Sequence, residues 1–298
     1  MIDLLKGQRK KYLTNKLNGM IAKFHAVSNK SSEITTKEYS TSFSSAIRLL
    51  HQDMRQPIYN IYGFVRFADE IVDTFHEYDK TSLLKEFKKE TYVAIDRRIS
   101  LNPIINSFQQ TVNAYNIDHD LIGAFFNSME MDLAQINYDT RNFNDYVYGS
   151  AESVGLMCLY VFCEGKKELY EKLKFSAQAL GSAFQKVNFL RDMKADYNGL
   201  SRMYFPGCDF NNFREEEKKQ IEADIHKDFK TAYNGILKLP LKSRFGVYVA
   251  YKYYLSLFKK IKSLEPARVL ETRIRIPDYK KAMIILKAGV KNHLGLIG

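Results

Sequence analysis

Long segments in which apolar residues recur at helical spacing cover most of the chain, and short polar breaks separate them. The breaks are residues 29–40, 137–145, 206–213 and 263–269. Each segment between them is longer than a dozen residues, and strictly alternating patterns are rare, which favours helices over strands. Only 15 Gly and 6 Pro occur among 298 residues, so few residues interrupt the helices. The pattern predicts an all-α protein.

The chain is expected to form a single domain over residues 1–298. It contains no internal repeat, no low-complexity segment and no Pro/Gly-rich linker, and a chain of this length can bury a large core. Residues 1–30 are expected to be a peripheral N-terminal segment.

The pattern also places Pro57 in the first turn of one helix. Asp145 is predicted to cap the start of another helix, which stops at Gly165.

One of the helices carries charged residues among apolar ones, in the stretch YGFVRFADEIVD from Tyr62 to Asp73. Residues four, seven and eleven positions apart share a helix face, so Arg66, Asp69 and Asp73 lie on the face of Tyr62. The other flank offers apolar residues to the core: Ile61, Val65, Ala68 and Val72. This helix is therefore predicted to be apolar on one flank and anionic on another.

A second anionic stripe lies far along the chain, in LGSAFQKVNFLRDMKAD, and Arg191 flanks it. Its members are Gly181, Gln185, Asn188, Asp192 and Asp196. Buried carboxylates are costly unless a cation neutralises them. Solvation, or pairing with lysines, would account for one helix that carries two aspartates four positions apart. Two motifs, each beside an arginine, are better explained by Mg²⁺, which takes one or two carboxylates together with substrate phosphates. The arginines would then hold diphosphate oxygens.

The charge balance favours an anionic partner. Lys and Arg number 45 against 34 Asp and Glu, which leaves a net charge of +11. This excess suits a phosphorylated substrate or an acidic membrane surface, and a merely solvated basic exterior is the alternative. We do not expect a nucleic-acid partner, because a basic binding face gives no reason for two inward acidic helices.

The cysteines and the hydropathy favour a cytoplasmic protein. Cys158, Cys163 and Cys208 form no C-x-x-C pair, and two of them lie in an apolar run. Such cysteines fit buried thiols in a reducing compartment. The start MIDLLKGQRKK lacks the apolar run of a signal peptide. No segment approaches the ~18 consecutive apolar residues of a transmembrane helix.

A series of motifs carries a resemblance to one known family. In chain order they are YSTSF, YGFVRFADEIVD, MEMDL, YVYGSAESVGLM, LGSAFQKVNFLRDMKAD, RMYFP and TRIRIP, and they span residues 39–277. Together they resemble the squalene/phytoene synthases, the head-to-head prenyl diphosphate synthases, and most of all the bacterial phytoene synthases. The resemblance implies an isoprenoid synthase fold, with helices around a central cavity, and a prenyltransferase that uses Mg²⁺, with Mn²⁺ as the alternative ion.

The reaction that the resemblance implies has two steps. One prenyl diphosphate loses diphosphate to give an allylic cation, and a second molecule captures it as a cyclopropylcarbinyl diphosphate. A second ionisation and rearrangement then join the two C1 carbons. MEMDL and VGLM favour phytoene, made from two C20 geranylgeranyl diphosphates. The alternative is C15 farnesyl diphosphate, which gives squalene, dehydrosqualene or presqualene diphosphate, with NADPH needed only if squalene forms.

The resemblance also assigns roles to individual residues. The expected Mg²⁺ ligands are Asp69, Asp73, Asp192 and Asp196. The residues expected to bind diphosphate are Ser40, Ser42, Arg66, Gln185, Asn188, Arg191, Arg202 and Arg273. The rings expected to stabilise carbocations are Tyr146, Tyr204 and Tyr254, the last chosen over Tyr251 and Tyr253. The alternatives are ordinary salt bridges for the arginines, helix capping for the serines and core packing for the tyrosines.

Two positions depart from the family pattern. Arg202 lies one residue further beyond Asp196 than expected, and Glu152 stands where a glycine is usual, so it is expected to reshape the cavity wall.

Two other functions compete. A terpene cyclase normally has Asn, Ser/Thr and Glu in its second metal motif, and a non-enzymatic basic helical protein would not need inward carboxylates. Because the product would be insoluble in water, we also expect peripheral contact with an anionic membrane.

Overall fold

The structure is a computed structural model that describes residues 2–134, 138–200, 204–271, 273–295 and 297, with the backbone alone for residues 2–16, 18 and 198–200. The described residues form helices and no strand, which confirms the all-α prediction. The α-helices are α1 (Ile2–Tyr39), α2 (Thr41–Ile47), α3 (Gln52–Asp73), α4 (Lys80–Arg97), α5 (Pro103–Tyr115), α6 (His119–Ala134), α7 (Thr140–Val147), α8 (Ser153–Phe162), α9 (Lys167–Leu200), α10 (Glu215–Ile236), α11 (Leu241–Lys262), α12 (Pro266–Val269) and α13 (Asp278–His293). A π-helix, η1 (Tyr148–Glu152), joins α7 to α8, and a 3-10 helix, η2 (Phe210–Asn212), precedes α10.

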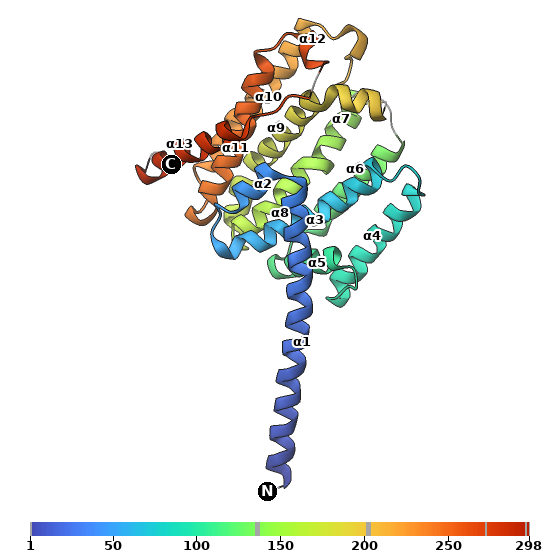
Figure 1. The fold of residues 1–298 in the computed structure, drawn as a ribbon, viewed down its shortest axis with the longest axis vertical. Coiled ribbons are helices and arrows are strands. Elements are labelled where there is room, and N and C mark those ends of the chain that lie inside the picture. The colour runs from blue at the N-terminus through green and yellow to red at the C-terminus, as the bar shows by residue number, and fades with distance from the viewer. Residues whose placement is uncertain (1, 135–137, 201–203, 272, 296, 298) are drawn as a thin grey trace.

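The C-terminal part of α1 packs against the body of the molecule. There Ser28, Ser32 and Thr36 are buried where α1 contacts α3 and α5, and the hydroxyls of Ser32 and Ser107 lie 2.6 Å apart. Further towards the N-terminus, Leu17 and Met20 are exposed. Figure 1 shows this part of α1 projecting from the body.

The core is centred on α3, which contacts α1, α4, α5, α6 and α8. Phe64 of α3 is fully buried. Its ring stacks on Phe108 with centroids 3.8 Å apart and on Phe87 at 5.4 Å. The flank of α3 predicted to be apolar meets this core, since Ile61, Ala68 and Val72 are buried.

Two predicted helix starts are wrong and one predicted end is confirmed. Helix α3 begins at Gln52, so Pro57 lies inside the helix and not in its first turn. Asp145 lies within α7, and the residue that caps α7 is Asp139, whose carboxylate accepts a hydrogen bond from the Asn142 amide. In both cases the helix begins further upstream, and in α7 the local cap by Asp139 sets that start. Gly165 follows the end of α8 with a φ of +73°, a conformation that glycine adopts without strain.

The π-helix η1 packs unusually close to its neighbours. A Cβ added at Gly149 would lie 2.3 Å from the carbonyl oxygen of Ala124 in α6. A Cβ added at Gly181 of α9 would lie 2.6 Å from the carbonyl oxygen of Ala151 in η1. Glycine at these two positions therefore lets α6, η1 and α9 approach one another, which brings the residues after η1 beside α9.

No helix in the described part of the chain is both long enough and apolar enough to cross a membrane.

Candidate active site

A cavity of about 460 Å³ lies between α2, α3, α8, α9 and α11. Along α3 the lining changes from the apolar Ile58 to the charged Asp69. Along α9 it changes from the apolar Leu173 to the charged Arg191. The latter two residues are separated by about 27 Å along the helix axis. Tyr254 of α11 lies at the polar end of both helices, because it interacts with Tyr62 of α3 as well as with Arg191. The cavity therefore has a polar end and a long apolar end.

Arg66 lies at the polar end with one donor unused. Its guanidinium pairs with Glu70 one turn further along α3 and stacks on the ring of Tyr39 at 4.4 Å. Its Nε is buried and has no hydrogen-bond partner among the described residues. A buried donor without a partner is costly, so an anionic oxygen at this position would satisfy it.

The carboxyl of Asp69 is unusually hard to ionise. Burial, followed by the neighbouring carboxylate of Asp73, raises its pKa to about 8; Arg66 opposes this shift and Asp132 adds to it. Like charges on closely spaced carboxyls oppose the ionisation of both. A divalent cation would favour the ionised form, so the Asp69/Asp73 pair suits a metal ligand set made of oxygens.

The second acidic motif is held by arginines. Asp192 accepts hydrogen bonds from Arg191, with Nε to Oδ2 at 3.0 Å, and its Oδ1 lies 2.8 Å from Nε of Arg273. Arg191 and Arg273 line the cavity, whereas Asp192 lies behind them and Asp196 is partly exposed one turn further along α9. No three His, Cys, Asp or Glu side chains in the described ranges are grouped closely enough to form a metal cluster by themselves. The carboxylate pairs on α3 and α9 thus fit Mg²⁺ only if substrate phosphates and water complete its ligands.

A chain of polar groups crosses the polar end from η1 to α11. The amide of Gln185 donates to the Ser150 hydroxyl at 3.2 Å, and the amide of Asn188 donates to Oε1 of Gln185 at 3.4 Å. The hydroxyl of Tyr254 then donates to Oδ1 of Asn188 at 3.2 Å. All four residues line the cavity, so neutral hydrogen-bonding groups lie beside the arginines.

Tyr254 is also part of an aromatic wall. Its ring stacks on Phe184 with centroids 3.8 Å apart, and Phe43 meets it edge-on at 6.0 Å. Tyr251 and Tyr253, the alternatives considered from the sequence, are buried and do not line the cavity. Burial raises the pKa of Tyr254, so its hydroxyl keeps its proton.

The buried carboxylate of Asp132 accepts hydrogen bonds from three tyrosine hydroxyls. Tyr146 donates to it at 2.7 Å, Tyr138 at 3.3 Å and Tyr204 at 3.5 Å. Tyr146 lines the cavity, whereas Tyr204 stacks behind it with centroids 5.2 Å apart. Burial, followed by the negative charge of Asp132, raises the pKa of Tyr146 well above its ordinary value. Sequence analysis did not single out Asp132, although an acid in the apolar stretch around MEMDL was a visible signal.

The remaining predicted residues are distributed as follows. Ser40 lines the cavity and also caps α2, since its hydroxyl accepts a hydrogen bond from the Phe43 amide at 3.2 Å. Ser42 is partly buried and is not among the lining residues, and Arg202 lies outside the described residues. Glu152 does not reshape the cavity wall as expected, because it accepts a hydrogen bond from Gln178 of α9 at 3.2 Å and is not a lining residue.

Comparison with protein families matches residues 36–280 to the model for squalene/phytoene synthases. The chain belongs to the squalene/phytoene synthase family. Members of this family are prenyltransferases that join prenyl diphosphates head-to-head.

Similar proteins within the squalene/phytoene synthase family have several products. The phytoene synthase of Arthrospira platensis is 26% identical over 275 residues, which cover 84% of this chain and 88% of that protein. The 4,4'-diapophytoene synthase of Staphylococcus haemolyticus is 27% identical over 199 residues, which cover 64% and 67%. Among solved structures, a dehydrosqualene synthase superimposes with a TM-score of 0.78 at 18% identity, over 91% of this chain and 98% of that one. The structural likeness establishes the isoprenoid synthase fold, as predicted.

Proposed function

We propose that the protein condenses two geranylgeranyl diphosphates head-to-head into phytoene, through a cyclopropylcarbinyl diphosphate, and releases two diphosphates. The observation that carries this proposal is the polarity of the cavity. Cationic and amide side chains gather at one end, and a largely apolar lining follows α9 away from them from Phe184 to Leu173, over about 17 Å of helix. A prenyl diphosphate has the same division between an anionic head and an apolar tail.

Diphosphate binding is assigned to the arginines at the polar end. The unused Nε of Arg66 offers a donor that a phosphate oxygen satisfies. Arg191 and Arg273 face the cavity while they hold Asp192, and a guanidinium can bind two oxygens at once. Gln185 and Asn188 add neutral donors, which hold a departing diphosphate without opposing the positive charge that develops on the allyl group.

Asp69 and Asp73 on α3, with Asp192 and Asp196 on α9, are the residues we propose to hold Mg²⁺. The ion supplies positive charge that stabilises diphosphate as a leaving group. Asp192 would keep its contacts with Arg191 and Arg273, both of which line the cavity.

The aromatic side chains are proposed to protect the carbocation. The rings of Tyr146 and Tyr254 line the cavity, and a desolvated ring face stabilises a cation by ~0.5–2 kcal/mol. Because burial keeps both hydroxyls protonated, neither forms an anion that would trap the cation. Asp132 fixes the orientation of Tyr146 through the hydrogen bond between them.

The C20 substrate is supported by the broad match to a phytoene synthase, which covers 84% of this chain. The alternative is the same chemistry on C15 farnesyl diphosphate, giving dehydrosqualene, squalene or presqualene diphosphate. The resemblance to a 4,4'-diapophytoene synthase supports that alternative. NADPH would be required only for squalene. We also propose a cytoplasmic location with peripheral contact to a membrane, because the apolar product cannot leave into water.

Incubation of the purified protein with Mg²⁺ and either the C20 or the C15 diphosphate, with and without NADPH, tests the proposal. We expect phytoene from the C20 substrate, without need of reductant, and loss of product when the metal is chelated. Asp69→Asn should abolish turnover, whereas Asp96→Asn, at an exposed position of α4, should not. Absence of both hydrocarbon and cyclopropyl intermediate from either substrate contradicts the enzyme assignment, and product from the C15 substrate alone selects the alternative.

A further inference from the structure

The outer face of α13 carries an apolar stripe that no described part of the chain covers. Its members are spaced four, seven, eleven and fifteen positions after the first, as on one face of a helix. They are Tyr279, Met283, Leu286, Val290 and Leu294, with exposed fractions of 64%, 45%, 69%, 53% and 61%. Single exposed apolar residues are common, but a row of four over about 17 Å of α13, continued by Leu294 at its C-cap, marks a binding surface.

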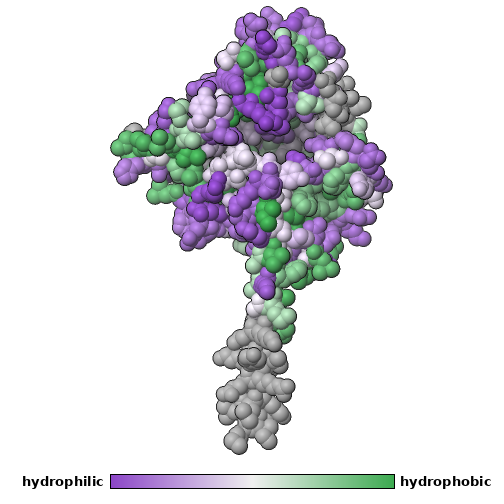
Figure 2. All heavy atoms as spheres, viewed as in Figure 1, coloured by the Kyte–Doolittle hydropathy of each residue, from purple (hydrophilic) through white to green (hydrophobic). Residues whose placement is uncertain are grey.

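The opposite face of α13 is already in use. Ala288 is buried, and Ile284 and Ile285 pack against the core, where α13 contacts α11. Figure 1 shows α13 along the edge of the body, and Figure 2 shows apolar residues gathered at this edge. The stripe therefore faces solvent because α13 is anchored by its other side.

Lysines border one side of the stripe. Lys280, Lys287 and Lys291 share one flank of α13 at helical spacing, whereas Lys281 lies on the anchored face and pairs with Asp278, the one carboxylate of the helix. On α11, Lys252 lies near Lys291, and burial followed by the charge of Lys291 lowers the pKa of Lys252. An apolar helix face flanked by lysines is typical of helices that lie in the interface of an anionic bilayer.

A second copy of the chain fits this surface less well. A symmetric contact would bring each stripe, and the lysines beside it, against its own copy. Like charges would then face each other on a protein whose net charge is +11. An anionic lipid surface complements both the apolar stripe and the lysines, since it accepts the apolar side chains and attracts the positive charges.

The anchored face of α13 lies close to the polar end of the cavity. Lys281 donates to the hydroxyl of Thr41 at 3.1 Å, and Thr41 follows Ser40, which lines the cavity. Arg273, another lining residue, lies five residues before α13 begins. A surface bound by the stripe would therefore lie one helix width, about 10–12 Å, from the residues proposed to bind diphosphate.

We propose that the outer face of α13 docks the protein on an anionic lipid bilayer and holds the polar end of the cavity beside the membrane surface. The docking itself does not depend on the reaction. The use of docking, to take up amphipathic substrates and return an apolar product, rests on the proposed function.

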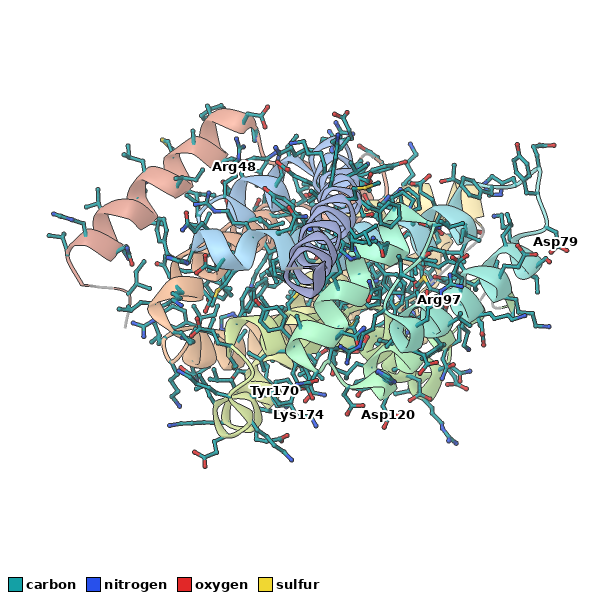
Figure 3. The ribbon with its side chains drawn as sticks, turned by 90° about the horizontal axis from the view of Figure 1, so that it is seen from below. Arg48, Asp79, Arg97, Asp120, Tyr170 and Lys174 are labelled. Carbon is teal, nitrogen blue, oxygen red and sulfur yellow. The ribbon has the colours of Figure 1, made fainter. Side chains whose placement is uncertain are left out.

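Vesicle flotation without substrate tests the docking. Wild-type protein should bind vesicles that contain phosphatidylglycerol, bind pure phosphatidylcholine weakly, and lose binding as salt is raised. The variant Leu286→Glu/Val290→Glu should bind anionic vesicles at least about tenfold less, because two apolar side chains are lost from the membrane contact. The matched control is Leu101→Glu/Phe175→Glu, which changes two side chains exposed by 87% and 73% elsewhere. Figure 3 places Lys174, next to Phe175, on a side of the molecule away from α13.

Equal binding by wild type and the α13 variant would overturn the proposal and direct attention to α1. Equal weakening in the control would overturn it as well, since charge alone would then explain the effect. A dimer that dissociates in the α13 variant, with vesicle binding unchanged, would identify the stripe as a contact between copies. Thermal unfolding of both variants checks their folding, and turnover of detergent-dispersed substrate separates a failure of docking from a failure of the enzyme assignment.

Discussion

Asp132 shows how a single buried carboxylate can order part of a cavity wall. Three tyrosine hydroxyls donate to it, and hydrogen bonds to an ionised acceptor are about twice as strong as neutral ones. Its charge also helps to raise the pKa of Asp69. Asp132 itself is not a lining residue, so we expect it to act by positioning Tyr146.

Replacing this carboxylate by its neutral isostere tests that role. Asp132→Asn should lower kcat by about tenfold or more, because Tyr146 loses a charged acceptor, with little change in KM. Steady-state kinetics would measure kcat and KM separately for each variant. Glu130→Gln is the matched control, since it removes the same charge from a half-exposed position of α6. A similar loss in both variants, or a loss confined to KM, would contradict a positioning role.

Glu152 supplies a test of stability against pH. Burial raises its pKa to about 7, and the charge of Lys186 only partly opposes this shift, because Lys186 is paired with Asp224 and Asp228 on α10. A raised pKa in the folded state means that ionisation favours unfolding. The protein should therefore lose stability as pH rises from the ordinary glutamate value of 4.5 to about 7.

Glu152→Gln should remove this loss. Allowing for partial solvent exposure, we expect the variant to be more stable than wild type by about 1 kcal/mol above pH 7, a rise in Tm of roughly 2–4 °C. The difference should vanish at acidic pH. Glu171→Gln, at an exposed position of α9, is the control. A stabilisation that is the same at both pH values would exclude the ionisation of Glu152 as its cause.

At the scale of elements, close backbone approach around η1 decides where the cavity wall lies. The π-helix joins α7 to α8 and packs between α6 and α9, which sets the position of Ser150 and Ala151 in the wall. Helical periodicity alone does not reveal such an element, because a π-helix depends on its contacts with neighbouring helices.

Gly149→Ala should destabilise the protein by about 1–3 kcal/mol, because the new methyl meets the rigid backbone oxygen of Ala124. A fall in Tm of several degrees would be seen by circular dichroism. Gly123→Ala in α6 is the control, since its Cβ would meet the Tyr92 hydroxyl at 3.6 Å, an ordinary contact. If the two variants have the same Tm, the close approach at η1 has no energetic consequence.

At the scale of the whole molecule, the cavity joins residues from helices that are far apart in the chain. Its apolar end is closed by α9, α10 and α11, and Ser176 of α9 lies there beside Gly235 of α10. The depth of this end should select the length of the prenyl chain, because a pocket rejects a longer substrate when its end is filled.

Ser176→Leu should shift the preference from the C20 to the C15 diphosphate. We expect kcat/KM for the C20 substrate to fall about tenfold or more while the value for the C15 substrate changes little. Competition between the two substrates in one reaction measures the ratio. Ser176→Ala, which removes the hydroxyl and adds no volume, should leave the ratio unchanged. An unaltered ratio in Ser176→Leu would place the end of the prenyl chain elsewhere.

The sequence by itself determined the all-α class and the helix faces. The period of 3.6 residues is local, so the spacing of Arg66 and Asp69 already placed them on one face of a helix, and both line the cavity. The same holds for Gln185 and Asn188. The family could also be recognised from the order of its motifs, and residues 36–280 match it.

Tertiary structure alone decided which of these faces meet and what their side chains contact. Asp192 and Arg273 are paired across 81 positions of the chain, and Asp132 meets Tyr204 across 72. Spacing along one helix says nothing about such pairs, because they depend on how helices pack. For the same reason Glu152 points to α9 and not to the cavity. Local periodicity determines the face of each helix, whereas the packing of distant segments creates the site between them.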